Sequence, residues 1–198
     1  MLRIPQIRSL RRFRRDAEGL AAVEFALILP AMLIMLFGMF EVSNIVGCRA
    51  RVAQLASTVA DLIAQKSSLT EGDINSIYAA AGAILYPYNT DEPGIRITSV
   101  IWDSTKSAND QGAKKAGKVA WSCSKNGGGL GPQHAENSTW TFDHELLSVG
   151  SSVIMVEVDY SYDLPTKVVT GPFPMKDSFH TKPRRVAQIP KPASCPSG

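Results

Sequence analysis

Residues 16–41 decide the topology of the chain, and they read Asp16-Ala-Glu-Gly-Leu-Ala-Ala-Val-Glu-Phe-Ala-Leu-Ile-Leu-Pro-Ala-Met-Leu-Ile-Met-Leu-Phe-Gly-Met-Phe-Glu41. The run from Leu20 to Phe40 contains one charged side chain, Glu24. As an α-helix this run would be roughly 31 Å long at 1.5 Å per residue, and the hydrocarbon core of a bilayer is ~30 Å thick. The run is therefore long and apolar enough to span a membrane.

The residues before this run are strongly basic. Their arginines are Arg3, Arg8, Arg11, Arg12, Arg14 and Arg15. By the positive-inside rule these cations hold the N-terminal end in the cytoplasm, so the residues after the span are exported. The leader has no apolar face to bury, and we expect it to be disordered. Within residues 1–19 the arginines are opposed only by Asp16 and Glu18, so the formal net charge of +3 reflects topology and predicts no nucleic-acid surface.

Glu24 does not fit an ordinary membrane anchor, because an ionisable group inside a span costs about 2.5–3.5 kcal/mol on insertion scales. One interpretation is that Glu24 lies shallow and its carboxylate reaches the cytoplasmic headgroups. In another, cleavage of the Gly19–Leu20 bond leaves Leu20 with a free amine of pKa about 7.7–8.0. Glu24, one helical turn later, would then neutralise the amine of a neighbouring subunit in apolar surroundings.

The same stretch resembles two related groups of proteins. A basic leader, Gly19 and then Glu24-Phe25 are similar to the prepilin-peptidase motif of type IV pilins, in which glycine precedes the cut and glutamate follows at the fifth position. The longer string 18–30, followed by Phe37-Gly38 and Glu41, resembles the TadE/TadG-like proteins, minor pseudopilins of the tight-adherence (Flp-type, type IVb) pilus system. A weaker resemblance lies in Trp121-Ser122, residues 156–162 and Pro183-Arg184-Arg185.

The resemblance implies a minor pseudopilin that a prepilin peptidase matures between Gly19 and Leu20. It implies that Glu24 and Phe25 take part in subunit pairing. Phe25 replaces the tyrosine usual in the major Flp pilins, and the chain is far longer than theirs, so a minor component is favoured over the bulk subunit. The implied partners are the membrane, the peptidase, other pilins or pseudopilins and inner-membrane assembly proteins. The implied location is a single pass of the bacterial inner membrane, with the C-terminal domain periplasmic or extracellular.

Two helices are predicted from the apolar periodicity. The first runs from about residue 17 to 66 and is kinked at Pro30, which lacks a backbone N–H. Its second half is amphipathic, with an apolar seam at Ile45, Cys48, Val52, Leu55, Val59 and Leu62. After a break at residues 67–69, Thr70-Glu-Gly-Asp73 predicts a capping box for a second helix that ends at Tyr86-Pro87.

Four strands are predicted from β-branched and alternating patterns: Ile95–Asp103, Lys118–Cys123, Val153–Tyr162 and Ser178–Lys182. Val119, Trp121 and Cys123 are expected on one face of the second strand. Residues 104–117 and 127–132 are expected to be loops, and the tail 189–198 to be extended. The predicted fold is α+β and pilin-like: a long N-terminal helix, membrane-spanning in its first half, and a second helix packed on a four-stranded antiparallel sheet. Its segments are a leader (1–19), the long helix (20–66) and an exported domain (67–198).

The three cysteines indicate one disulfide and one free thiol, because the domain is exported to an oxidising compartment. Cys48 falls on the apolar seam and is expected to stay reduced and buried. Cys123 and Cys195 lie in polar, Gly/Pro-rich surroundings and are expected to bridge, tying down a tail with few apolar residues. A bridge between the Cys48 residues of two copies is the alternative.

No catalytic residue, metal site or cofactor is expected. The histidines show no metal-ligand spacing, and neighbouring residues such as Asp143-His144-Glu145 point apart. Glu157 and Asp159 share one strand face, which we expect to be solvated rather than to hold a cation. The alternatives to a pseudopilin are an uncleaved bitopic assembly protein and an unrelated membrane-anchored periplasmic binding or enzymatic domain. The N-terminal residue of the membrane-bound chain would separate them.

Overall fold

The computed structural model of the chain describes residues 17–88, 92–103, 114–125, 128–131, 133–143, 146–165 and 171–195. The chain divides into two units between Ser43 and Asn44, and each is described by itself. The predictions for the basic leader, for residues 104–113 of the expected loop, for Gly127 and for His144-Glu145 lie outside the described residues.

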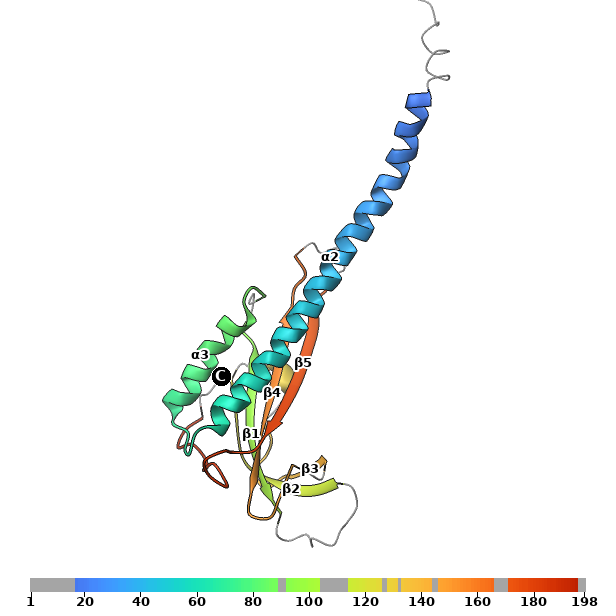
Figure 1. Cartoon of the computed structure of the whole chain (residues 1–198). Helices are drawn as coiled ribbons and strands as arrows, with labels where there is room; N and C mark the ends of the chain where they lie inside the picture. Colours follow the sequence, from blue (N-terminus) through green and yellow to red (C-terminus); the bar gives the residue numbers. More distant parts are fainter. Residues whose placement is uncertain are drawn as a thin grey trace, which may run out of the picture. The chain divides into compact units, whose positions relative to one another are not determined.

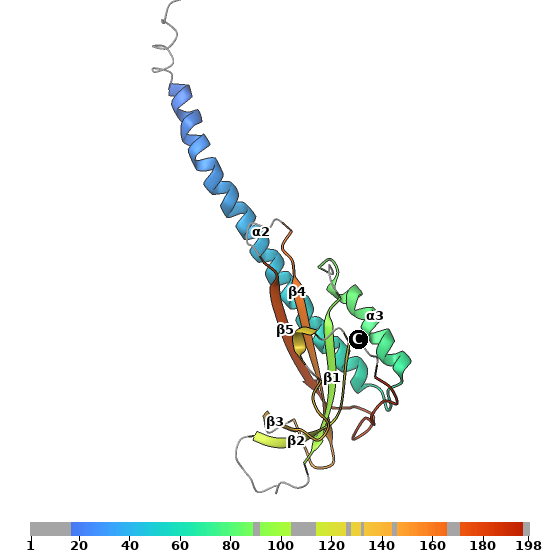
Figure 2. The ribbon, with the colours of Figure 1, turned by 180° about the vertical axis from the view of Figure 1, so that it is seen from behind.

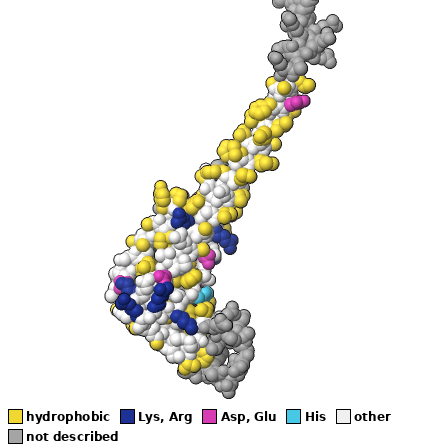
Figure 3. All heavy atoms as spheres, viewed as in Figure 1, with side chains coloured by type: hydrophobic (Ala, Val, Ile, Leu, Met, Phe, Trp, Pro, Cys, Tyr) yellow, Lys and Arg dark blue, Asp and Glu magenta, His cyan; other side chains and the backbone are white. Residues whose placement is uncertain are grey.

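Helix α2 spans Ala17–Ala64, so the prediction of one long helix is confirmed. Every residue from Gly19 to Phe37 is exposed, because no other described element covers this part of the helix. Figure 3 shows hydrophobic side chains over this part of the helix. It is the part of α2 that is long and apolar enough to cross a membrane. Pro30 lies inside the helix, which continues through it.

From Asn44 onward α2 belongs to the second unit, and one side of it is buried. Cys48, Val52, Leu55 and Val59 are at most 1% exposed, which confirms most of the predicted seam. In the last turn the prediction is wrong: Leu62 is 39% exposed and Ile63 is fully buried. Leu62 and Ile63 lie three and four residues after Val59, and both spacings return to the same helix face. Which of the two is buried therefore depends on the element packed against the helix and not on the spacing.

Helix α3 spans Glu71–Leu85, and its predicted capping box is present. Thr70 Oγ1 accepts a hydrogen bond from the Asp73 backbone N–H at 3.1 Å, and the Asp73 carboxylate accepts one from the Thr70 backbone N–H at 3.1 Å. The Asp73 carboxylate also accepts a hydrogen bond from Lys66 at 2.8 Å, which lowers the pKa of Asp73. The helix ends where predicted, at Tyr86 before Pro87.

The sheet has five strands rather than the predicted four: β1 Gly94–Trp102, β2 Lys114–Lys125, β3 Thr139–Asp143, β4 Ser152–Tyr162 and β5 Phe173–Thr181. Their order is β3-β2-β1-β4-β5, and each neighbouring pair is antiparallel. The additional strand β3 pairs with the start of β2, at residues 114–118 that were expected to be mostly loop. The start of β2, Lys-Lys-Ala-Gly-Lys, has low β-propensity and becomes a strand through the ladder, whereas β3, Thr-Trp-Thr-Phe-Asp, is rich in β-formers but only five residues long.

A β-bulge in β2 overturns the prediction that Val119 shares a face with Trp121 and Cys123. Ser99 pairs with Trp121 and Val100 pairs with Val119, so Ala120 has no opposite residue. The additional residue reverses the alternation of side chains, and Val119 therefore lies in a second core with Val100, Val153 and Leu147.

The main core lies between the sheet and the helices. α3 and the second-unit part of α2 cover one face of the sheet (Figures 1 and 2). Its strand residues include Ile97, Trp121, Val156 and Tyr160, and all are at most 1% exposed. The apolar face predicted for the strongest strand, β4, is thus confirmed.

Gly117 in β2 tests how tightly the second core is packed. A Cβ at this position would lie 2.5 Å from Val100 Cγ1, 3.0 Å from the Ile101 carbonyl oxygen and 3.0 Å from Leu147 Cδ2. We expect Gly117→Ala to lower the free energy of unfolding by about 1–3 kcal/mol, as overpacking does. Urea unfolding of the chain in detergent, followed by tryptophan fluorescence, measures the change.

Gly82→Ala in α3 is the matched control. A Cβ at Gly82 meets nothing within 4 Å, so the same substitution should raise stability by up to ~1 kcal/mol through helix propensity. Equal effects of the two substitutions would contradict the packing argument.

Candidate functional site

The first candidate site is the Gly19–Leu20 bond, which lies in the first turn of α2. Both residues are exposed, and a Cβ added at Gly19 meets nothing within 4 Å. The described fold therefore does not need a glycine here, although glycine inside a helix costs roughly 0.5–1 kcal/mol relative to alanine. If a glycine is required at position 19, the requirement does not come from the packing of the described residues.

Glu24 lies one turn after Leu20 on the same side of α2, since residues four apart on a helix are neighbours. It is exposed, and it has no hydrogen-bond or ion-pair partner among the described residues. A free amine on Leu20 would lie within reach of the Glu24 carboxylate of the same chain. The pairing between two chains stays a prediction.

Phe25 and Pro30 complete the predicted residues of this segment. Phe25 is 59% exposed, next to Glu24 in the apolar surface. Pro30 lies one turn after Ala26, whose carbonyl loses its usual N–H donor. The structure places all the predicted residues of this segment on one helix, but it brings none of them against another described element.

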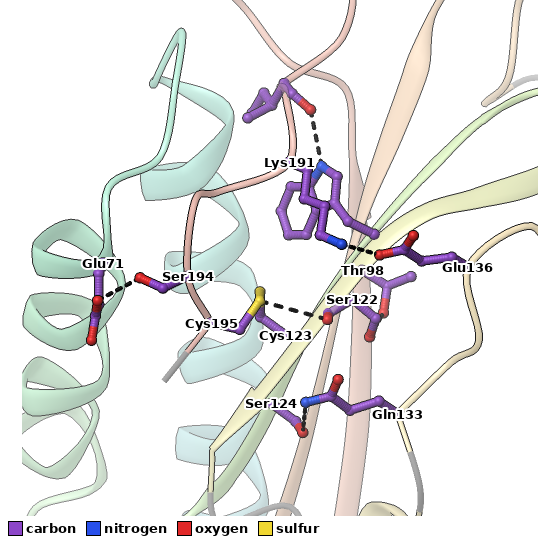
Figure 4. The surroundings of a disulfide bond; sticks show 12 residues. Glu71, Thr98, Ser122, Cys123, Ser124, Gln133, Glu136, Lys191, Ser194 and Cys195 are labelled. Atoms are coloured by element: carbon purple, nitrogen blue, oxygen red, sulfur yellow. Dashed lines mark hydrogen bonds and ion pairs between the residues drawn. A yellow bond between two sulfur atoms is a disulfide. The ribbon is translucent and has the colours of Figure 1, made fainter. Parts of the chain in front are cut away.

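The predicted cysteine pair forms the second candidate site. The structure joins Cys123 in β2 to Cys195 by a disulfide with a Cα–Cα distance of 5.4 Å (Figure 4). The two residues are separated by 72 positions, and a cross-link of that span stabilises a folded domain by roughly 4 kcal/mol on the chain-entropy model. Cys48 is free and buried, as expected.

The tail also docks through contacts that sequence reasoning missed. Residues 183–195, here called the C-terminal strap, contain no helix or strand. The Ile189 side chain is 2% exposed, and its carbonyl oxygen accepts a hydrogen bond from Trp121 Nε1 at 3.0 Å. The backbone N–H of Arg184 donates to the Ala64 carbonyl oxygen at 2.8 Å. The strap therefore rests on non-covalent contacts as well as on the disulfide.

A buried arginine organises the face of the sheet opposite the helices. Arg96 in β1 is 1% exposed, and its Nη2 donates to the carbonyl oxygens of Leu130 at 2.9 Å and Gly131 at 2.6 Å. Its Nη1 lies 3.4 Å from Glu157 Oε2, and His134 Nε2 lies 2.7 Å from the same oxygen. These contacts hold Leu130, Gly131 and His134 over that face.

The prediction that Glu157 and Asp159 lie on a solvated face is therefore wrong. Their side chains are 20% and 14% exposed, and Lys176 Nζ lies 3.8 Å from Asp159 Oδ2. The missed signal was the pairing of β1 with β4, which sets Arg96 directly opposite Glu157. On the same side burial lowers the pKa of His180, and the Glu157 charge partly opposes this shift.

A groove with a volume of about 420 Å³ lies between the end of α2 and α3. Leu62, Ile77 and Ala80 give it apolar walls, and Lys66 and Arg185 add charge. No group of three or more His, Cys, Asp or Glu side chains placed to hold a metal occurs in the described ranges.

Residues 19–61 match a family model, TadE, whose description is TadE-like protein. The match covers about a fifth of the chain and includes Gly19, Leu20, Glu24 and Pro30. The resemblance drawn from the motif is thus confirmed for this segment, which is TadE-like. No curated protein and no solved structure matches the chain.

Cys48 provides a test of the buried seam of α2. Burial raises the pKa of its thiol from 9.0 to about 11. Because the thiolate is the reactive form, alkylation by iodoacetamide at pH 8 should be on the order of 100-fold slower in the folded chain than in urea. The rate should rise about tenfold per pH unit up to the pKa. Intact mass of the non-reduced protein measures it, and rates within a few-fold of each other would contradict the burial.

Proposed function

We propose that the chain is a minor pseudopilin that takes part in assembling a tight-adherence pilus. The single observation that carries the proposal is the TadE-like segment, in which a lone glutamate lies one helical turn after an exposed glycine–leucine bond. The apolar part of α2 supports a single-pass membrane anchor. The protein acts through assembly and not through catalysis.

Maturation begins with hydrolysis of the Gly19–Leu20 peptide bond by a prepilin peptidase. Water adds across the bond, so Gly19 gains a carboxylate and leaves with the basic leader, while Leu20 gains an amine. The exposed first turn of α2 is where such an enzyme would bind the backbone, and a glycine without a Cβ permits the closest approach.

Assembly then depends on charge neutralisation inside the bilayer. The Leu20 amine and the Glu24 carboxylate are each costly in hydrocarbon, and pairing them between subunits removes much of that cost. The surrounding apolar side chains from residue 20 to 37, all exposed in the isolated chain, offer the surface on which other pilins or pseudopilins would pack. Pro30 leaves a carbonyl free for a local adjustment of the helix.

The arginine-rich leader supports an N-terminus in the cytoplasm and an exported C-terminal domain, by the positive-inside rule. The Cys123–Cys195 disulfide supports the same orientation, because such bonds persist in oxidising compartments. Together they favour the inner membrane of a bacterium, with residues 44–198 in the periplasm or outside.

Processing is tested by Gly19→Val. A β-branched side chain at the cut should block the peptidase and leave a chain longer by the leader, which a gel and N-terminal sequencing would detect. Gly38→Val is the matched control, because Gly38 lies in the same helix and also has nothing within 4 Å of its would-be Cβ. The control should be processed normally and begin at Leu20.

An intact leader on the wild-type chain would overturn cleavage at this bond and would favour an uncleaved bitopic accessory protein. A wild-type chain that begins at a residue other than Leu20 would overturn the assigned cleavage position.

Pairing is tested separately by Glu24→Gln, which removes the charge at nearly constant shape. Membrane content and cleavage should stay normal, while incorporation into assemblies falls at least tenfold, because the Leu20 amine loses its counter-charge. Glu24→Asp keeps the charge on a shorter stem and should recover part of the loss. Cross-linked complexes from membranes, quantified against total protein, measure the effect. Equal incorporation of the glutamine variant and the parent would exclude a pairing role.

A further inference from the structure

The C-terminal strap closes the end of α2. The last carbonyls of a helix have no intrahelical donor, and α2 has no basic residue in its last turn. The strap supplies the missing hydrogen-bond donor and the missing positive charge. The Arg184 N–H donates to the Ala64 carbonyl oxygen, and the Arg184 guanidinium pairs with Asp61. The end of the helix is therefore capped by a segment from the other end of the chain.

The strap also touches the sheet and α3. The Ser152 N–H at the start of β4 donates to the Ala187 carbonyl oxygen at 2.9 Å. Ser194 Oγ donates to a carboxylate oxygen of Glu71, in the first turn of α3 (Figure 4). One segment of about 13 residues thus joins α2, α3 and the sheet.

The ion pairs of the strap are weak. The Arg184–Asp61 side chains are 62% and 41% exposed, and those of Lys191 and Glu136 are 58% and 50% exposed. Ion pairs at such exposure contribute little. Ile189 and Pro192 are the strap's buried residues, so there is little apolar area to offset the entropy of ordering the segment.

The disulfide lies at the far end of the strap from β5. While it is intact, the strap is tethered at both ends and can open only as a short loop. Closing a loop of about 13 residues shifts the opening equilibrium by roughly a hundredfold on the chain-entropy model. Because the ion pairs are exposed and the strap buries few apolar side chains, we expect the covalent tie to decide whether the strap stays docked.

We infer that the strap is an oxidation-dependent clasp, which holds the end of α2 only after Cys123 and Cys195 have been joined. The two thiols lose two protons and two electrons, and the electrons reduce the disulfide of a thiol–disulfide oxidant to two thiols. Cys195 is half-buried and accessible to that exchange, whereas Cys123 is fully buried. This inference does not depend on the pilus role.

With this clasp, the redox state of the compartment decides whether the strap is docked on the domain. In a reducing compartment the strap is open and the Ala64 carbonyl is uncapped. After exposure to an oxidant the strap closes over the end of α2 and the first turn of α3.

Hydrogen exchange of the full chain in phosphatidylcholine nanodiscs tests the clasp, with and without dithiothreitol. On reduction, the amides of Arg184 and Ser152 should exchange about a hundredfold faster. The amides of residues 52–59 in α2 and 154–160 in β4 should stay protected, although their slow exchange through global unfolding also becomes faster when the cross-link is lost. A Cys123→Ala/Cys195→Ala double variant should reproduce the reduced pattern without dithiothreitol, and Cys48→Ser should match the parent in both conditions.

Two outcomes would overturn the clasp. Unchanged exchange at Arg184 on reduction would mean that the non-covalent contacts suffice. Loss of protection throughout α2 and β4 would mean that the bond holds the entire domain and not a separate strap. Hydrogen exchange of the reduced parent chain still tests the clasp if the double variant fails to fold.

Discussion

Burial of one side of α2 is the constraint on which the second unit depends. From Asn44 to Ala64 the helix presents a single apolar seam, and Cys48, Val52, Leu55 and Val59 are removed from water against the sheet and α3. Burying such side chains contributes on the order of 1.5–3 kcal/mol each, far more than the exposed ion pairs around them. The strands, the capping box and the strap are arranged so that this seam stays covered.

The same helix meets two different solvents along its length. From Gly19 to Phe37 its side chains are exposed in the isolated chain and, apart from Glu24, uncharged, which suits lipid or other transmembrane helices. From Asn44 onward, polar side chains lie on the side of the helix that faces water. This change of pattern within one element allows a single helix to serve as anchor and as core. It also places Glu24 where no described residue neutralises it, which is the physical basis of the proposed pairing between subunits.

Much of the fold could be predicted, and the errors have identifiable causes. The long helix, the Thr70–Asp73 box and β4 follow from local patterns that no distant contact had to correct. The start of β2 was missed because it becomes a strand by pairing with β3, and β3 was missed because it is only five residues long. Val119 was placed on the wrong face because the bulge at Ala120 reverses the alternation. Glu157 was misjudged because its partner, Arg96, lies 61 residues away and is brought opposite by the β1–β4 register.

The sequence by itself determined the apolar segment long enough to span a membrane, the position of its single charge, the TadE-like motif and the cysteines suited to bridge. These features depend on composition and on spacing within one helix or one turn, where neighbours along the chain are neighbours in space. The tertiary structure alone decided that Ile63 rather than Leu62 completes the seam, that Arg96 is buried, and that Arg184 caps α2. Each of these depends on residues that are distant in sequence and meet only when the sheet has formed, so no local pattern records them.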